Sequence, residues 1–292
     1  MNLSKTSGIN KLNKIWVDEY HESTRFGLRG KKILEEESEY QKITIFDSDR
    51  YGKALLLDHC WMCAENQEKE YHEAIVHPAL TSAEKIEKIL IIGGGDGGTA
   101  KECLKYNELK QIDMVEIDQK VIQLSKKYLP CIGGGCWEDS RLNVIIGDGI
   151  KWVKNTKEDY YDVIIIDSSD PKGAAKGLFN QIFFRNCHRI LRTNGVFSAQ
   201  TESPESFQEI HINAVKLIRS IFKYADPLYG NMPLYPSGYW SWTFASKKSQ
   251  RYLHPIPERS SQIVSKCNIW SPRWQKGSFE AIPAQIEREL KT

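Results

Sequence analysis

The chain has 292 residues, enough for one large domain or two of ordinary size. Its 40 Lys and Arg nearly balance 38 Asp and Glu, and the formal net charge of +2 argues against a general binder of nucleic acid. Hydrophobic residues make up 40% and charged residues 27%, values that exclude an intrinsically disordered chain.

The sequence also carries information about the cellular compartment. No apolar run approaches the ~18 residues that a membrane span requires. Residues 1–20 are polar and lack the apolar core of a signal peptide. The seven cysteines follow no spacing pattern, which is typical of reduced thiols. We therefore expect a cytoplasmic protein that has no membrane partner.

Short apolar runs dominate the first part of the chain. Residues 42–46 and 54–57 are β-like and are separated by turn-forming residues, which predicts a small antiparallel β unit. Residues 68–80 carry apolar side chains at helical spacing and predict a connecting helix. We accordingly predict an N-terminal β domain over residues 1–66 and a larger domain over residues 67–292.

Strand-like and helix-like segments alternate after residue 85. The strand-like runs are 89–92, 112–117, 144–146, 163–166 and 195–199. The helical stretches between and after them include 121–129, 178–191 and 207–222. Buried strands separated by helices indicate an α/β fold with a doubly wound, mostly parallel sheet. The aromatic run 239–244 alternates and predicts an antiparallel strand at an edge of that sheet.

A glycine-rich loop follows the first of these strands. Residues Gly93 to Gly98 contain the pattern Gly-x-Gly-x-x-Gly between a strand and a helix, as in nucleotide-binding turns, so Gly93 and Gly95 are candidate ligand contacts. Glu116 and Asp118 end the next strand, where an acid commonly bonds a ribose hydroxyl. The alternative is a tight turn that needs glycine only for close packing.

The charge of the loop indicates which nucleoside fits. Asp96 lies inside the loop, where a carboxylate would repel a pyrophosphate and would pair with a cation. S-adenosylmethionine has no phosphate, although its carboxylate would crowd Asp96, and a decarboxylated form removes that conflict. We therefore favour an adenosyl-sulfonium ligand. Asp148 is placed either to accept from the adenine amine or to cap the helix that follows it.

A pair of acids follows the fourth strand of the larger domain. Ligands in open parallel sheets bind beyond the carboxyl ends of strands, so Asp167 and Asp170 should face the reactive end of the ligand. A primary amine arrives protonated because its pKa is near ~10, and a carboxylate can hold it and take its proton. Asp167 is thus the candidate base, although an Asp there could also serve only the turn. Tyr71, Tyr235 and Glu202 are candidate amine contacts.

Several motifs together resemble the spermidine synthases, which are aminopropyltransferases. They are Tyr40-Gln41, Leu57-Asp58, Tyr71-His72-Glu73, Gly93–Gly98, Val115–Asp118, Asp167–Pro171 and Tyr235–Gly238. The glycine loop combined with Asp-Ser-Ser-Asp-Pro is specific to that family, and the likeness runs from about Trp16 to Ser246.

The resemblance implies transfer of an aminopropyl group from decarboxylated S-adenosylmethionine to putrescine, giving spermidine and methylthioadenosine without a metal or other cofactor. It implies a Rossmann-like fold of the class I S-adenosylmethionine methyltransferase type and a homodimer or homotetramer. In such proteins the matching positions bind the donor at Gln41, Asp96, Glu116 and Asp148, contact the acceptor at Tyr71, Asp170 and Tyr235, and use Asp167 as base. We further expect His72 near the nucleoside as a neutral hydrogen-bonding group.

The sequence departs from the family pattern in one stretch. His59 replaces a Gly, Met62 replaces a Gln that lines the site, and Gln67-Glu68-Lys69 replaces Asp-Glu-Phe. These changes leave open another acceptor, namely agmatine, cadaverine or a triamine. Two further alternatives are a methyltransferase acting on an amine and a non-catalytic relative that binds a nucleoside or polyamine. The histidines His59, His72 and His77 fit no usual metal-ligand spacing, so we expect no metal site.

Overall fold

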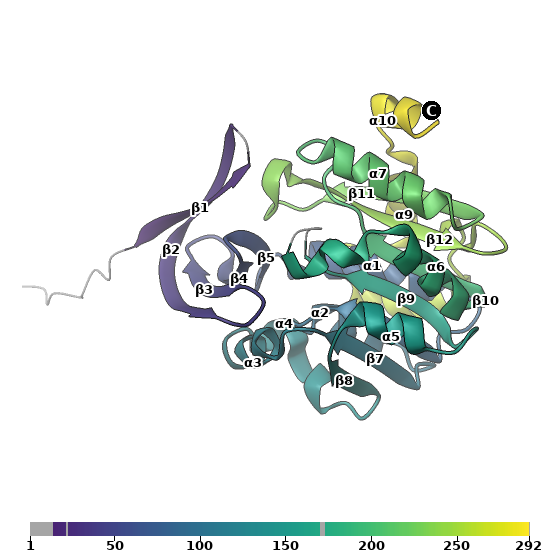
Figure 1. The fold of residues 1–292 in the computed structure, drawn as a ribbon, viewed down its shortest axis with the longest axis horizontal. Coiled ribbons are helices and arrows are strands. Elements are labelled where there is room, and N and C mark those ends of the chain that lie inside the picture. Colours follow the sequence, from purple (N-terminus) through teal and green to yellow (C-terminus); the bar gives the residue numbers. More distant parts are fainter. Residues whose placement is uncertain (1–13, 22, 170–172, 292) are drawn as a thin grey trace, which may run out of the picture.

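The computed structural model describes residues 14–21, 23–169 and 173–291, which form a small β unit beside a larger α/β unit (Figure 1). The small unit is an antiparallel sheet whose strands lie in chain order, and this confirms the predicted antiparallel unit. Its strands are β1 (Ile15–His21), β2 (Thr24–Glu37), β3 (Lys42–Ser48), β4 (Gly52–Leu57) and β5 (Cys60–Ala64).

The sequence analysis missed β1, β2 and β5. Much of β1 and β2 is exposed, with Trp16 at 66% and Tyr20 at 70% exposure, and charged residues fill the end of β2. A strand that buries no regular face lacks the two-residue hydrophobic alternation by which strands are recognised. These two strands are positioned instead by pairing, since β2 bonds β1 on one side and β3 on the other.

The larger unit contains a mostly parallel sheet in the order β11-β12-β10-β9-β6-β7-β8, which confirms the predicted fold class. Its parallel strands are β6 (Lys88–Gly93), β7 (Gln111–Glu116), β8 (Leu142–Ile146), β9 (Tyr161–Asp167) and β10 (Leu191–Gln200). The helices are α1 (Glu68–Ser82), α2 (Gly98–Leu104), α3 (Gln119–Tyr128), α4 (Pro130–Gly133), α5 (Gly149–Asn155), α6 (Gln181–Ile190), α7 (Gln208–Arg219), α8 (Pro257–Ile263), α9 (Pro272–Glu280) and α10 (Ala284–Lys291).

One strand prediction was wrong in its position. The aromatic run forms β12 (Tyr239–Ser246), which pairs antiparallel with β10, but it is not an edge strand. The edge is β11 (Tyr224–Asn231), which pairs with the other side of β12. Sequence patterns gave no strand there because Asp226 and Pro227 interrupt it, and an edge strand tolerates a proline that cannot donate to the ladder.

Helices cover both faces of the parallel sheet, as Figure 1 shows. Alternate residues of β6 belong to different apolar clusters: Ile89 and Ile91 pack on the α1 side, and Leu90 and Ile92 pack on the α6 side. Because both faces are buried, the strands read as continuous apolar runs. Since β6 pairs in parallel with both β7 and β9, the carboxyl ends of these three strands lie together at one end of the sheet.

The C-terminal segment fixes α1 against this sheet. The buried carboxylate of Glu73 accepts backbone N–H groups of Asn268, Ile269 and Trp270 at 2.8–3.1 Å. The guanidinium of Arg259 donates to the carbonyl of Leu80 at 2.8 Å near the end of the same helix. Helix α1 is thus held at two places, in its second turn by Glu73 and near its C-terminal end by Arg259.

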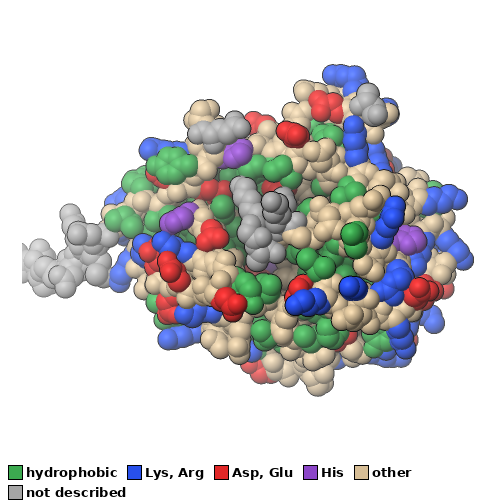
Figure 2. Space-filling model, viewed as in Figure 1, with side chains coloured by type: hydrophobic (Ala, Val, Ile, Leu, Met, Phe, Trp, Pro, Cys, Tyr) green, Lys and Arg blue, Asp and Glu red, His purple; other side chains and the backbone are tan. Residues whose placement is uncertain are grey.

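The surface is consistent with the balanced composition. On the face drawn in Figure 2, basic and acidic side chains are interspersed over the described residues and form no continuous basic stripe of the kind that tracks a phosphate backbone. All seven cysteines are free thiols. In the described part of the chain, no helix has the length and apolarity that crossing a bilayer demands.

Candidate active site

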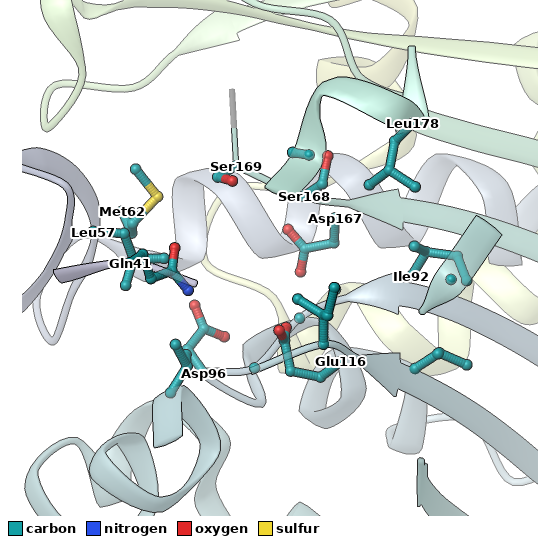
Figure 3. A pocket seen from close by; sticks show the side chains of 18 of the residues that line it. Gln41, Leu57, Met62, Ile92, Asp96, Glu116, Asp167, Ser168, Ser169 and Leu178 are labelled. Carbon is teal, nitrogen blue, oxygen red and sulfur yellow. The ribbon is translucent and has the colours of Figure 1, made fainter. Parts of the chain in front are cut away.

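A cavity lies where the small unit meets the carboxyl ends of the parallel strands. In Figure 3, Asp96, Glu116 and Asp167 direct their carboxylates into one space, and Gln41 and Met62 approach it from the small unit. Ile92 and Leu178 line an apolar part of the wall. The cavity therefore combines an apolar region with convergent acids, as a nucleoside carrying a cation would require.

The glycine loop is shaped by close contact between β6 and β9. Gly93 has φ +87° and a Cβ there would lie 2.0 Å from the carbonyl oxygen of Asp167, so only glycine fits. The N–H of Gly94 donates to that same oxygen at 2.9 Å. Gly93 and Gly95 also line the cavity. The loop therefore allows close packing of β6 against β9 and also forms part of the cavity wall.

His72 lies buried between two carboxylates. Its Nδ1 is 2.8 Å from Oε2 of Glu68, and its Nε2 is 3.4 Å from Oδ1 of Asp96. Burial alone would favour the neutral imidazole, but Asp96 and Glu68 raise the pKa of His72 well above its ordinary value. The expectation of a neutral His72 was therefore wrong, because the sequence did not show that two acids flank it.

Asp96 is ionised despite its burial. Burial opposes ionisation, but the His72 cation and the N–H of Gly98, 2.7 Å from Oδ1, outweigh it and lower the pKa of Asp96 to about 2. Gly98 lets the histidine approach, since a Cβ there would lie 2.1 Å from the imidazole. The loop thus presents a fixed negative charge to the cavity.

Asp167 ends β9 and has the opposite shift. Burial and the charge of Asp96 raise the pKa of its carboxyl, although His72, Thr99 and Tyr71 act against this rise. Thr99 donates to Oδ2 of Asp167 at 2.7 Å, and the hydroxyl of Tyr71 hydrogen-bonds the same carboxylate. A buried carboxylate with a raised proton affinity, fixed by two hydroxyls, is suited to accept a proton.

Glu116 ends β7 and also lines the cavity. Burial, reinforced by Asp118 and Asp167, raises the pKa of Glu116 to about 7. Asp148 lines the cavity too, and it caps α5 by accepting the N–H of Ile150 at 2.8 Å. The two interpretations of Asp148 that the sequence left open are therefore compatible, since one carboxylate oxygen caps the helix and the residue still borders the cavity.

A smaller adjoining cavity extends from the acidic end. It shares Met62, Tyr71, Ser168, Ser169 and Tyr235 with the first cavity, and its further lining includes Glu19, Trp61, Gln200, Phe207 and Trp240. The sequence analysis missed Glu19 and Trp61 because it did not predict β1 and β5. The hydroxyl of Tyr235 donates to the backbone oxygen of Met62 at 2.7 Å and so ties the two units together.

One of the predicted acceptor contacts, Glu202, is not among the residues that line the two cavities. Glu202 has φ +66° and is fully buried, and it lies outside the walls of both cavities, beside Gln200, whose amide donates to it at 3.2 Å. Glu202 is therefore neither a solvent-exposed acid nor part of a cavity wall. Asp170 lies outside the described residues.

One cluster resembles a metal site in composition. Within the described residues, ligand atoms of Glu73, His77 and Cys267 lie within 4.8 Å of one another. Backbone N–H groups already occupy the carboxylate of Glu73, and the two ring nitrogens of His77 are 2.9 Å from Tyr106 Oη and Glu102 Oε2. These hydrogen bonds give the cluster a structural explanation: Glu73 attaches the C-terminal segment to α1, and His77 attaches α1 to Glu102 of α2 and to Tyr106.

The fold and the cavity together define a Rossmann-like protein whose acid-lined cavity is bordered on one side by a separate β unit. Comparison with known proteins agrees with this class. The family model for the spermine/spermidine synthase domain matches residues 68–254, and that for the spermidine synthase tetramerisation domain matches residues 15–65.

Similar sequences and structures extend over nearly the whole chain. Polyamine aminopropyltransferases of two Prochlorococcus marinus strains are 64% and 62% identical, over 96% of this chain and 97% of each relative. A spermidine synthase solved with the transition-state analogue AdoDATO has a TM-score of 0.91 at 32% identity, covering 99% of this chain and 98% of that one. The spermidine synthase of Thermotoga maritima has a TM-score of 0.90 at 32% identity, covering 97% of both chains. This chain belongs to the spermine/spermidine synthase family and is an aminopropyltransferase of the spermidine synthase type.

Proposed function

We propose that the chain transfers the aminopropyl group of decarboxylated S-adenosylmethionine to putrescine, with spermidine and methylthioadenosine as products. The observation that carries this proposal is the pairing of Asp96 and Asp167 in one buried cavity with opposite pKa shifts. One acid stays ionised and holds a cation, and the other has an increased tendency to accept a proton.

The donor would lie along the glycine loop. Its ammonium would pair with Asp96, its ribose would meet Gln41 and Glu116, and its adenine would occupy the apolar region beside Ile92 and Asp148. Intact S-adenosylmethionine carries an additional carboxylate, which Asp96 would repel in this low-dielectric site. The decarboxylated compound therefore fits the charge of the site better.

The reaction needs one base and good alignment. The amine loses a proton to Asp167, its nitrogen lone pair forms a bond to the propyl carbon next to sulfur, and the carbon–sulfur bond breaks with its electrons moving to sulfur. The leaving thioether is neutral and needs no acid. Tyr71 holds Asp167 and, with Tyr235, walls the path of the incoming amine. We propose no metal or other cofactor for this step.

A second candidate differs only in the acceptor. Met62 lines both cavities and presents a flexible thioether at their junction. A thioether adapts to apolar surfaces of different shape, so a longer or differently substituted amine, such as cadaverine or agmatine, would be accommodated there.

The assembly and compartment belong to the same proposal. The match to a tetramerisation domain falls on the small unit, where Ile15, Trp16 and Tyr20 are exposed, and this supports a homodimer or homotetramer formed through that unit. The free cysteines support a reducing cytoplasmic location.

The test is a mass-spectrometric product assay in which decarboxylated or intact S-adenosylmethionine is supplied with putrescine, cadaverine, agmatine or spermidine in separate reactions. We expect spermidine and methylthioadenosine, formed fastest with putrescine. Faster turnover of another amine would show that this amine, and not putrescine, is the preferred acceptor. Product from intact S-adenosylmethionine alone would overturn the proposed donor, and no product with any amine would favour a non-catalytic relative.

A further inference from the structure

Asp118 stands just beyond β7, and its carboxylate faces the small unit. The residue is 2% exposed. Its Oδ2 accepts the hydroxyl of Ser38 at 2.6 Å and the amide Nε2 of Gln41 at 3.0 Å. Its Oδ1 accepts the N–H of Lys120 at 3.0 Å and thereby caps α3. Asp118 thus joins the β2–β3 turn of the small unit to the end of the nucleoside-binding strand.

The first consequence concerns the amide of Gln41, which lines the main cavity. A glutamine amide has one accepting end and one donating end of nearly equal shape, so either end could face a ligand. An ionised carboxylate only accepts hydrogen bonds. Because Asp118 engages the nitrogen, the amide oxygen Oε1 is the polar end that remains for a ligand.

The second consequence concerns Glu116. The backbone N–H of Asp118 donates to Oε1 of Glu116 at 2.9 Å and so orients that carboxyl group. Asp118 therefore controls two oxygen acceptors at once, one from each structural unit. A ribose carries hydroxyl donors on adjacent carbons, and it matches two acceptors presented in this way.

We propose that Asp118 is a positioning residue for nucleoside recognition: it fixes Gln41 so that the amide oxygen accepts from a ribose hydroxyl, and it directs Glu116 toward the same sugar. The inference rests on the proposed function, since it assumes an adenosine-type ligand in this cavity. Asp118 itself touches no ligand and acts through its two neighbours.

The test measures binding of methylthioadenosine by calorimetry, because this probe has the ribose and no ammonium. Asp118→Asn keeps the α3 cap, since asparagine caps helices as well as aspartate does. Its amide presents N–H toward Gln41, which must turn over and offer nitrogen to the ribose hydroxyl. We expect affinity to fall roughly tenfold, as for a lost hydrogen bond to a buried polar group.

A reciprocal exchange then tests the direction of the hydrogen bond. In the double variant Asp118→Asn with Gln41→Glu, the new carboxylate accepts from the new amide and again presents oxygen to the ribose. We expect the double variant to recover affinity to within roughly threefold of the original chain. Gln41→Glu alone places two carboxylates against each other and should bind more weakly than the double variant.

Asp113→Asn is the matched control. Asp113 is an equally buried acid of β7 that accepts from Tyr161 at 2.8 Å and lies outside the cavity walls. Its replacement should lower the melting temperature without lowering the affinity for methylthioadenosine. Unchanged affinity in Asp118→Asn, or a double variant no better than the single ones, would overturn the inference while leaving the proposed function intact. Failure of the unaltered chain to bind methylthioadenosine would overturn both.

Discussion

Nε2 of His72 lies 3.4 Å from Oδ1 of Asp96, and this buried pair sets the charge of the donor end of the cavity. The second nitrogen of His72 bonds Glu68, which in turn holds Nζ of Lys101 at 2.8 Å. Within this chain of alternating charges, the His72 cation helps to keep Asp96 ionised although burial opposes its ionisation. It also makes the fold sensitive to removal of the imidazole.

His72→Gln is expected to destabilise the protein by roughly 3 kcal/mol at pH 7, because it leaves buried carboxylates without their cation. The pKa of Asp96 should rise from about 2. In the unaltered chain, stability from Asp96 is present above its unfolded pKa and is lost as pH falls toward about 2. Urea unfolding at pH 7 and at pH 3 should show a smaller acid-induced loss in the variant, and equal losses would contradict the ion pair.

Asp167→Asn is expected to lower kcat by at least ~10²-fold, because it removes the positioned base. The fold should survive, since the asparagine oxygen can still accept from Thr99. Initial rates with saturating donor and putrescine, together with a melting curve, give the measurement. Near-normal turnover by a folded variant would remove Asp167 from the mechanism.

Asp96→Asn is expected to relax discrimination between decarboxylated and intact S-adenosylmethionine. The neutral amide no longer attracts the ammonium and no longer repels the carboxylate, so affinity for the two sulfonium compounds should converge. Competition against labelled methylthioadenosine measures both affinities. If the two fall by the same factor, charge at Asp96 does not select the donor.

Glu116 should lower the free energy of unfolding of the ligand-free protein as pH rises from about 4.5 to 7. Its pKa is raised from 4.5 to about 7 in the folded chain, so the native state binds more protons than the unfolded state within this window. The penalty approaches about 3 kcal/mol above pH 7. Glu116→Gln should remove that slope, as measured by denaturant unfolding across pH 4 to 8. Identical slopes in both proteins would show that Glu116 ionises normally.

Tyr235→Phe should lower the free energy of unfolding by about 1 kcal/mol, because it removes the hydrogen bond to the backbone oxygen of Met62. Since this bond joins the two units beside the acceptor path, we expect KM for the amine to rise more than KM for the donor. Steady-state kinetics with each substrate varied separately would show the split. A uniform change in both constants would indicate a general loosening instead.

The sequence alone determined the central fold because its signals are local. Uninterrupted apolar runs such as 89–92 and 163–166 must be buried on both faces, and they identified the parallel sheet. The glycine loop and the acids at strand ends identified the candidate site, because parallel strands bring their carboxyl ends to one edge.

Tertiary structure alone decided what depends on contacts between distant segments. It placed β11 at the edge in spite of Pro227. It also paired His72 with Asp96, which favours the charged imidazole over the neutral one that we expected. It also showed that Asp118 accepts a hydrogen bond from the amide of Gln41, whereas Glu116 lines the cavity. Charge states and hydrogen-bond directions are set by burial and by neighbours far apart in sequence, and a residue pattern carries neither.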